Sequence, residues 1–186
     1  IIEKEQEVQL NSSAKLNIID DGIMNFNYGD RWNGSVTLTS GVLNYTDLLA
    51  NNELIANGGT LNVLTSDMDI TTTLNLSETS SVSNDVVVNI QDKTLVNIKG
   101  GTVYLNNGDN WVGKIALIDG LLDYSDLISN GALAASDGKL NVNSGILTLS
   151  TDSFVEEPVI TLIDTNAEVH IKETGYMQLN SNDNWV

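Results

Sequence analysis

A five-residue phrase, glycine followed by alternating apolar residues, recurs along the chain and constrains its fold more than any other feature. Within each of two longer units, its glycines are 19 and then 18 residues apart. Alternation with period two predicts a short strand. The same phrase at the same step predicts equivalent strands stacked in a solenoid. The phrases are GIMNF, GVLNY, GTLNV, GTVYL, GLLDY, GKLNV and GYMQL, which begin at residues 22, 41, 59, 101, 120, 138 and 175.

The longer units are imperfect copies of each other. Residues 22–63 match residues 101–142 at 19 of 42 positions, at an offset of 79. A third copy begins near residue 175 and stops at Val186, within the phrase that contains Trp185. We therefore interpret residues 1–186 as one segment with internal repeats at about 22–100, 101–174 and 175–186.

The predicted fold is all-β, a parallel β-helix of about 19 residues per rung and roughly ten rungs. Helical solenoids do not fit, because no segment sustains an apolar spacing of 3.6 residues. We expect a short helical turn at 47–50 and at 126–129, each after a Thr or Ser cap. The residue between the two apolar positions of a phrase should face outward and form an asparagine ladder of Asn25, Asn44, Asn62 and Asn141, with Asn75 in a related phrase. One inward column should contain Met24, Leu43, Leu61, Val103, Leu122, Leu140 and Met177.

Charge and composition limit the partners. The chain has 25 acidic and 8 basic residues, a net charge of −17. An acidic surface repels phosphate, so we expect neither nucleic acid nor an anionic membrane as a partner. No apolar run has the length of a membrane-spanning helix, so we expect no direct membrane insertion. The absence of cysteine excludes disulfides.

These repeats resemble a known group of proteins. Acidic, cysteine-free, Gly/Asn/Ser/Thr-rich repeats with Gly-x-Leu-x-Val strands are similar to the passenger regions of bacterial autotransporters and other large surface adhesins. The resemblance implies a right-handed parallel β-helix that is secreted or held at the bacterial cell surface, associated with the outer membrane. It implies a stalk or an adhesive scaffold whose partners are glycans or proteins of a host or neighbouring cell. Such passengers share a scaffold and not a site, so no binding residue is carried over.

All three tryptophans lie in one recurring phrase, which we call the Trp phrase: GDRWNG at 29–34, GDNWVG at 108–113 and NDNWV at 182–186. In the structural interpretation the phrase is a corner, where Trp covers the core and its N–H binds a carbonyl. In the functional interpretation, Trp32 and Trp111 stack on sugar rings, and Asp30 and Asp109 bind sugar hydroxyls. We favour the corner, and a carbohydrate-binding module is the alternative.

The sequence gives little support for a catalytic site or for a metal site. The single histidine, His170, is expected to face outward alone, and no nucleophile is paired with a base. The aspartates lack calcium-loop spacing. We therefore expect an extracellular structural or adhesive segment that is no enzyme and holds neither cofactor nor metal. A polysaccharide-degrading β-helix is the third alternative. Because the last rung should expose unpaired backbone, we also expect end-to-end self-association of this chain.

Overall fold

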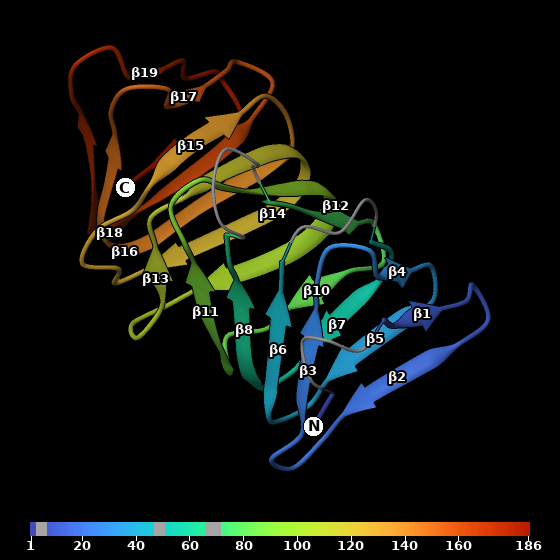
Figure 1. Ribbon diagram of the computed structural model, residues 1–186. Coiled ribbons are helices and arrows are strands. Elements are labelled where there is room, and N and C mark those ends of the chain that lie inside the picture. Colours follow the sequence, from blue (N-terminus) through green and yellow to red (C-terminus); the bar gives the residue numbers. More distant parts are fainter. Residues whose placement is uncertain (3–6, 47–50, 66–71) are drawn as a thin grey trace.

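The computed structural model describes residues 1–2, 7–46, 51–65 and 72–186, and it shows an all-β solenoid (Figure 1). The described residues form twenty strands and no helix, and every strand pair is parallel. The chain makes about 8 turns of roughly 20 residues each. The predicted parallel β-helix is therefore confirmed. There are fewer turns than the ten expected, because some are long: Leu61 pairs with Val88, 27 residues later.

Each turn crosses three faces, which we number by the strands that they contain. Face 1 begins with a five-stranded sheet of β3 (Ile23–Phe26), β6 (Val42–Tyr45), β8 (Gly59–Val63), β11 (Val86–Ile90) and β13 (Asn110–Trp111). It continues through residues 126–130 and then through the second halves of β16 (Lys139–Leu149) and β18 (Ile160–Ile171).

The long strands bend from one face to the next, two of them from face 2 to face 3, and β16 and β18 from face 3 to face 1. Face 2 comprises β1 (Gln9–Leu10), β4 (Arg31–Trp32), β9 (Thr72–Ser77), residues 94–99 of β12 (Thr94–Leu105), residues 114–117 of β14 (Lys114–Ser125), β15 (Ala132–Ala135), β17 (Phe154–Val155) and β19 (Tyr176–Met177). Face 3 comprises β2 (Lys15–Ile18), β5 (Ser35–Leu38), β7 (Leu54–Ala56), β10 (Ser81–Val82), residues 102–105, 121–125, 139–142 and 160–163 of the long strands, and β20 (Asn184–Trp185).

The core lies inside the coil and follows the predicted alternation. Leu122 and Tyr124 are fully buried, whereas Asp123 between them faces outward. Asp123 is half-buried and not fully exposed, because its carboxylate accepts hydrogen bonds from the side-chain amides of Asn141 and Asn143 on the next rung. The inside of this turn is therefore apolar, and the polar residue between the two core positions is bound to the neighbouring rung.

The glycine phrases do not form the single inward column that we predicted. Those of the first copy stack on face 1, where Leu43 pairs with both Met24 and Leu61. Those of the second copy stack on face 3, where Leu122 pairs with both Val103 and Leu140. The phrase of the third copy lies on face 2, in β19. The sequence repeat is therefore out of phase with the turns.

The reason is that a repeat does not contain a whole number of turns. From β3 the chain completes three turns to reach β11 on face 1, and then crosses two further faces to reach residues 102–105. From there it again makes three turns, to β18, and crosses two more faces to β19. The chain crosses the faces in the order 1, 2, 3, so the first copy begins on face 1, the second on face 3 and the third on face 2.

The predicted helical turn at residues 126–129 is wrong, and its counterpart at 47–50 lies outside the described residues. Asp126 has a φ of 53°, in the left-handed region, which a right-handed helix cannot start from. Its N–H binds the Ser144 carbonyl on the next rung. Leu127 turns into the core, and Ile128 is fully exposed. Contacts between rungs, and not local capping, set the backbone here.

The glycines before the strands have two separate roles. Gly41 and Gly120 have φ values of 86° and 90°, a backbone conformation that a residue with a Cβ would resist. Gly101 has no positive φ. An added Cβ there would lie 2.5 Å from the Ser80 carbonyl oxygen, so this glycine is required by close approach of the rung before it.

Candidate functional site

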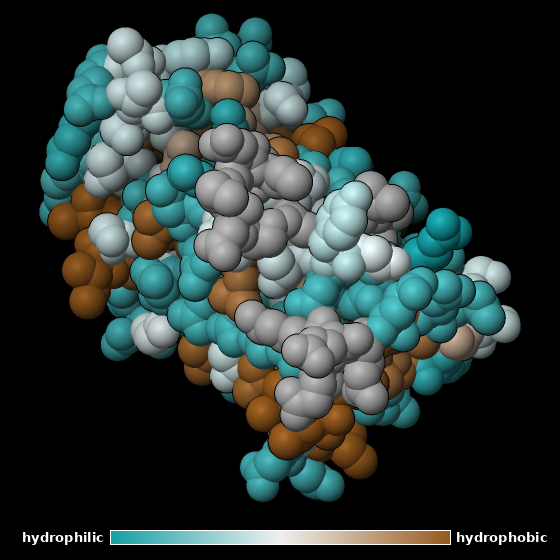
Figure 2. All heavy atoms as spheres, in the orientation of Figure 1, coloured by the Kyte–Doolittle hydropathy of each residue, from teal (hydrophilic) through white to brown (hydrophobic). Residues whose placement is uncertain are grey.

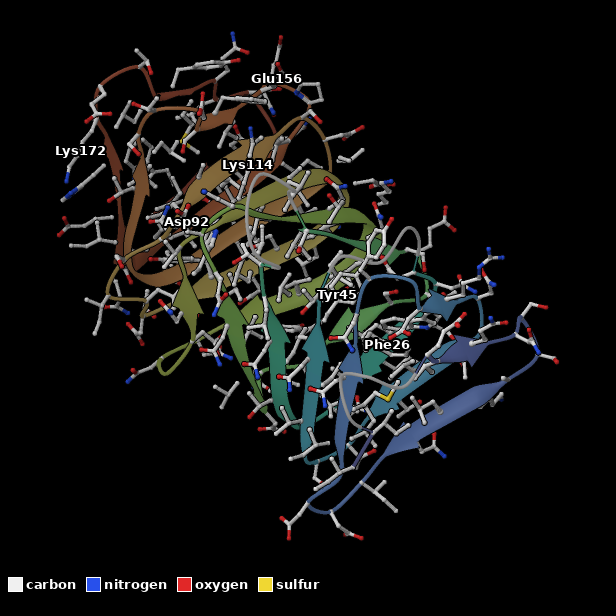
Figure 3. The ribbon with its side chains drawn as sticks, viewed as in Figure 1. Phe26, Tyr45, Asp92, Lys114, Glu156 and Lys172 are labelled. Carbon is white, nitrogen blue, oxygen red and sulfur yellow. The ribbon has the colours of Figure 1, made fainter. Side chains whose placement is uncertain are left out.

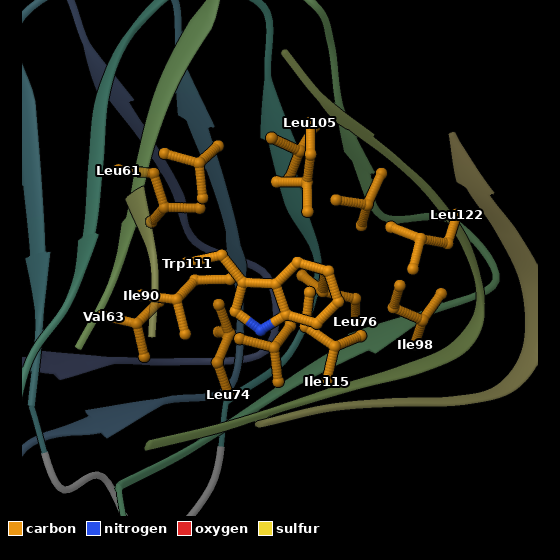
Figure 4. Packing of buried hydrophobic residues seen from close by; sticks show 14 of the residues in the cluster. Leu61, Val63, Leu74, Leu76, Ile90, Ile98, Leu105, Trp111, Ile115 and Leu122 are labelled. Carbon is orange, nitrogen blue, oxygen red and sulfur yellow. The ribbon is translucent and has the colours of Figure 1, made fainter. Parts of the chain in front are cut away.

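The first two tryptophans of the Trp phrase are inside the solenoid. Trp32 is 0% and Trp111 is 1% exposed. Each indole N–H donates to the carbonyl of the glycine that ends its own phrase, Gly34 at 3.1 Å and Gly113 at 2.9 Å. In Figure 4 the Trp111 ring lies in the centre of the coil, among apolar side chains from several turns. The predicted corner, in which Trp covers the core and its N–H binds a carbonyl, is confirmed for these two copies.

A tyrosine packs against each of these tryptophans. Trp32 meets Tyr45 edge-on at 6.2 Å between ring centroids, and Trp111 meets Tyr124 in the same way at 6.4 Å. Both tyrosine hydroxyls then donate at 2.7 Å to a carbonyl of a later rung. Because the two copies lie on different faces, this likeness reflects the local packing of the repeat and not a shared position on the rod.

Each aspartate of the Trp phrase joins two rungs. One carboxylate oxygen accepts an N–H from its own turn, and the other accepts an N–H from the rung before. Two charge-assisted hydrogen bonds to backbone groups hold the corner in register. The donors and distances are Val8 at 2.8 Å and Asn27 at 2.7 Å for Asp30, Val88 at 2.7 Å and Asn106 at 2.8 Å for Asp109, and Thr161 at 2.7 Å and Asn180 at 2.6 Å for Asp183.

Burial affects the acidity of Asp109. Removal from water raises the pKa of its carboxyl above the ordinary 3.8, because the charged form loses solvation. The N–H groups of Val88 and Asn106 lower it, but the effect of burial is larger. Asp109 therefore makes its two contacts with backbone N–H groups while its charged form loses part of its solvation.

The four residues predicted as a sugar site are brought together in pairs, but they face the wrong way for a sugar. Neither Trp32 nor Trp111 has an open ring face, and both oxygens of Asp30 and of Asp109 are occupied by backbone donors. The third tryptophan differs, because Trp185 is 62% exposed on the last strand. The geometry of the first two copies matches the corner interpretation.

Two asparagines with a structural role were not recognised from the sequence. Asn130 uses its side-chain amide to bind both the N–H and the C=O of Thr148 on the next rung, at 2.7 Å each. Asn51 binds Asn75 in the same manner. Each amide thus replaces a missing pair of strand hydrogen bonds. Their identity at matched positions in two copies was the signal that could have identified them.

The asparagine ladder is real but divided among the faces. On face 1 it continues through four rungs, with side-chain amide bonds of 2.7–2.8 Å between successive members Asn25, Asn44, Asn62 and Asn89. Asn75 instead pairs with Asn97 on face 2, and Asn141 pairs with Asp123 on face 3. These bonds add side-chain links along the rod to the backbone ladder.

Open grooves occur at corners of the solenoid. Two of them lie beside Ser77–Thr79 and beside Asp119 and Asp137, with volumes of about 440 and 420 Å³. Within the described residues, no group of three or more His, Asp or Glu side chains is arranged to hold a metal ion. His170 forms an exposed pair with Glu168, at 2.9 Å. No helix among the described residues is long and apolar enough to cross a membrane.

Comparison with known proteins gives no relative. No protein family, no curated protein and no solved structure matches the chain. The fold and the internal repeat are therefore the basis for any functional argument.

Proposed function

We propose that this chain is an extracellular structural or adhesive segment of a bacterial surface protein, and that it acts as an elongated scaffold or stalk. One observation carries the proposal: the polar atoms of the side chains that repeat bind the backbone of the rod itself, within a turn or on the neighbouring rung. Trp111, Asp109 and Asn130 each direct their polar atoms to backbone groups, and each has a counterpart in the first copy. A repeat selected for a stalk needs this internal network.

The rotation of the copies supports the same proposal. Trp32 lies on face 2, Trp111 on face 1 and Trp185 on face 3. A binding residue carried by the repeat would thus point in three directions and could not meet one linear glycan at successive sites. The repeat preserves packing within the rod, and this favours a scaffold over a tandem carbohydrate-binding module.

Contacts with partners are proposed for the outward side chains. In the view of Figure 2, hydrophilic residues cover much of the surface and separate smaller hydrophobic patches. Outward side chains that bind no neighbouring rung are free to contact a partner without loss of packing. Glycans or proteins of a host or neighbouring cell are the proposed partners. The proposed segment is non-catalytic, and it is secreted or held at the cell surface, associated with the outer membrane.

Location and adhesion test the proposal. An antiserum raised against residues 1–186 should label intact source cells as strongly as permeabilised cells. Latex beads that carry the chain should bind to neighbouring or host cells if it is adhesive, and should remain unbound if it is only a stalk. Labelling that requires permeabilisation would contradict both forms of the proposal.

A further inference from the structure

One corner groove combines a partly apolar floor with two acidic side chains in its walls. Its floor is a column on the outside of face 3, in which residues from four successive rungs pair with one another. Its walls are the corners that precede these strands, at Asp119, Asp137 and Pro158, and its volume is about 420 Å³. Four rungs span about 14 Å, which is the length of about four residues of extended chain. The floor residues are Thr102, Leu121, Lys139 and Ile160.

The two carboxylates of the groove are oriented alike. Asp119 accepts the N–H of Gly120 at 2.6 Å, and Asp137 accepts the N–H of Gly138 at 2.7 Å, each through Oδ1. They lie on successive rungs, about 4.8 Å apart along the rod. Both residues are exposed, and within the described part of the chain neither forms an ion pair, even with Lys139. Each carboxylate therefore keeps an oxygen for an outside donor.

The first copy contains the same corner without these charges. Its floor column has the same pairing, with apolar or hydroxyl side chains at every position. Ser40 stands at the position of Asp119, and Gly58 at that of Asp137. Gly59 approaches the Gly41 carbonyl in the first copy as Gly138 approaches that of Gly120 in the second. Because the corner folds with Ser and Gly, the carboxylates are not required by the fold. The first-copy floor residues are Ile23, Val42, Thr60 and Val87.

We propose that this groove binds a short, extended, basic segment of a partner protein. The two carboxylates suit Arg or Lys side chains, and Leu121, Ile160 and Pro158 suit the apolar stems and neighbours of those side chains. Glu157 beside Pro158 and the net charge of −17 add to the attraction for a cationic partner. This site goes beyond the scaffold role and does not depend on it.

The experiment measures binding of a labelled peptide, acetyl-Val-Arg-Leu-Arg-Val-amide, by fluorescence anisotropy at low and physiological salt. The variant Asp119→Ser/Asp137→Asn should bind about tenfold more weakly, since it loses two exposed ion pairs. The matched control, Asp92→Asn/Asp152→Asn, removes the same charge at a different corner, where Asp92 is labelled in Figure 3. The control should change the affinity by less than about twofold.

A variant at Lys139 tests whether the sign of the charge in the groove determines binding. Lys139→Thr introduces the first-copy residue and removes a like charge, so it should tighten binding of the basic peptide about two- to threefold. Circular dichroism of every variant checks the fold. Equal weakening by both double variants would show that only net charge attracts the peptide, and would overturn the proposal. Equal binding of a peptide with Gln for Arg would overturn it too, as would neutral oligosaccharides that bind the groove in place of the peptide.

Discussion

At the scale of single residues, polar side chains replace backbone hydrogen bonds wherever the chain leaves the sheet. Asp109 supplies an acceptor to two rungs, and Asn130 supplies both a donor and an acceptor. Ser80 does the same with a hydroxyl, which accepts from Leu54 and Ser77. A buried N–H without an acceptor costs about 1–3 kcal/mol, so these side chains are as necessary as the core.

Among the described residues, Thr161 and Ser83 are exceptions, because each has a buried hydroxyl without a hydrogen-bond partner. Thr161 leads to the first prediction, because it faces inward on face 3, paired with Leu140. Thr161→Val keeps the shape and removes the unsatisfied group, so it should raise the free energy of unfolding by about 1–2 kcal/mol. Urea denaturation measures this, with Thr148→Val on an outward position as the control. A less stable Thr161→Val protein would show that the hydroxyl does find a partner.

The second prediction concerns the pH dependence contributed by Asp109. Because burial raises its folded pKa above 3.8, the folded state binds this proton at a higher pH than the unfolded chain does. The contribution is therefore complete below about 3.8 and is lost as pH rises through the folded pKa. The difference in unfolding free energy, wild type minus Asp109→Asn, should fall as pH rises from about 3.5 to 6. A difference that grows over this range would mean that the two N–H donors outweigh burial.

At the scale of strands, β14 shows how the two sides of a rung differ. Leu122→Ala removes a fully buried side chain and should cost about 2–5 kcal/mol. Asp123→Ala removes the acceptor of the Asn141 and Asn143 amides, which stay partly exposed to water, and should cost about 0.5–1.5 kcal/mol. Urea melts of both variants, beside Asp92→Ala as an exposed control, measure the contrast. Equal losses for Leu122→Ala and Asp123→Ala would contradict the observed register.

The strands show what the sequence could predict. Period-two alternation correctly predicted the inward side of β6, β8 and β14, because a strand has only two sides. It could not predict which of three faces a strand joins, because every face is apolar inside and the phrase is the same on each. The Trp corner was predictable from its Asp and Gly neighbours. The repeat marks Asn51 and Asn130 as matched residues, but their hydrogen-bond partners could not be predicted, because these lie 24 and 18 residues away.

At the scale of the whole molecule, the repeat and the turn are two separate periods. A copy is one face short of four turns, so successive copies rotate about the rod axis. Within each copy, strands at matched repeat positions pair in the same way, whichever face they occupy. For example, Phe26 pairs with Tyr45 on face 1, and Leu105 pairs with Tyr124 on face 3; Phe26 and Tyr45 are labelled in Figure 3. Stacking should thus depend on the repeat register and not on the absolute face.

Deleting one repeat tests this idea. A chain that lacks residues 22–100 joins Asp21 to Gly101, which is the second-copy equivalent of Gly22. All later residues then move to another face, but each meets the neighbours that its repeat position requires. We expect a folded, shorter rod with native-like β circular dichroism and a cooperative urea transition.

The control lacks residues 24–108, which make four whole turns. Every remaining residue of the control therefore keeps its face, but the seam joins Ile23 to Asp109. The control should be the less stable protein by urea midpoint. If the control were the more stable one, the absolute face would govern stacking, and the rotation of the copies would have no structural meaning.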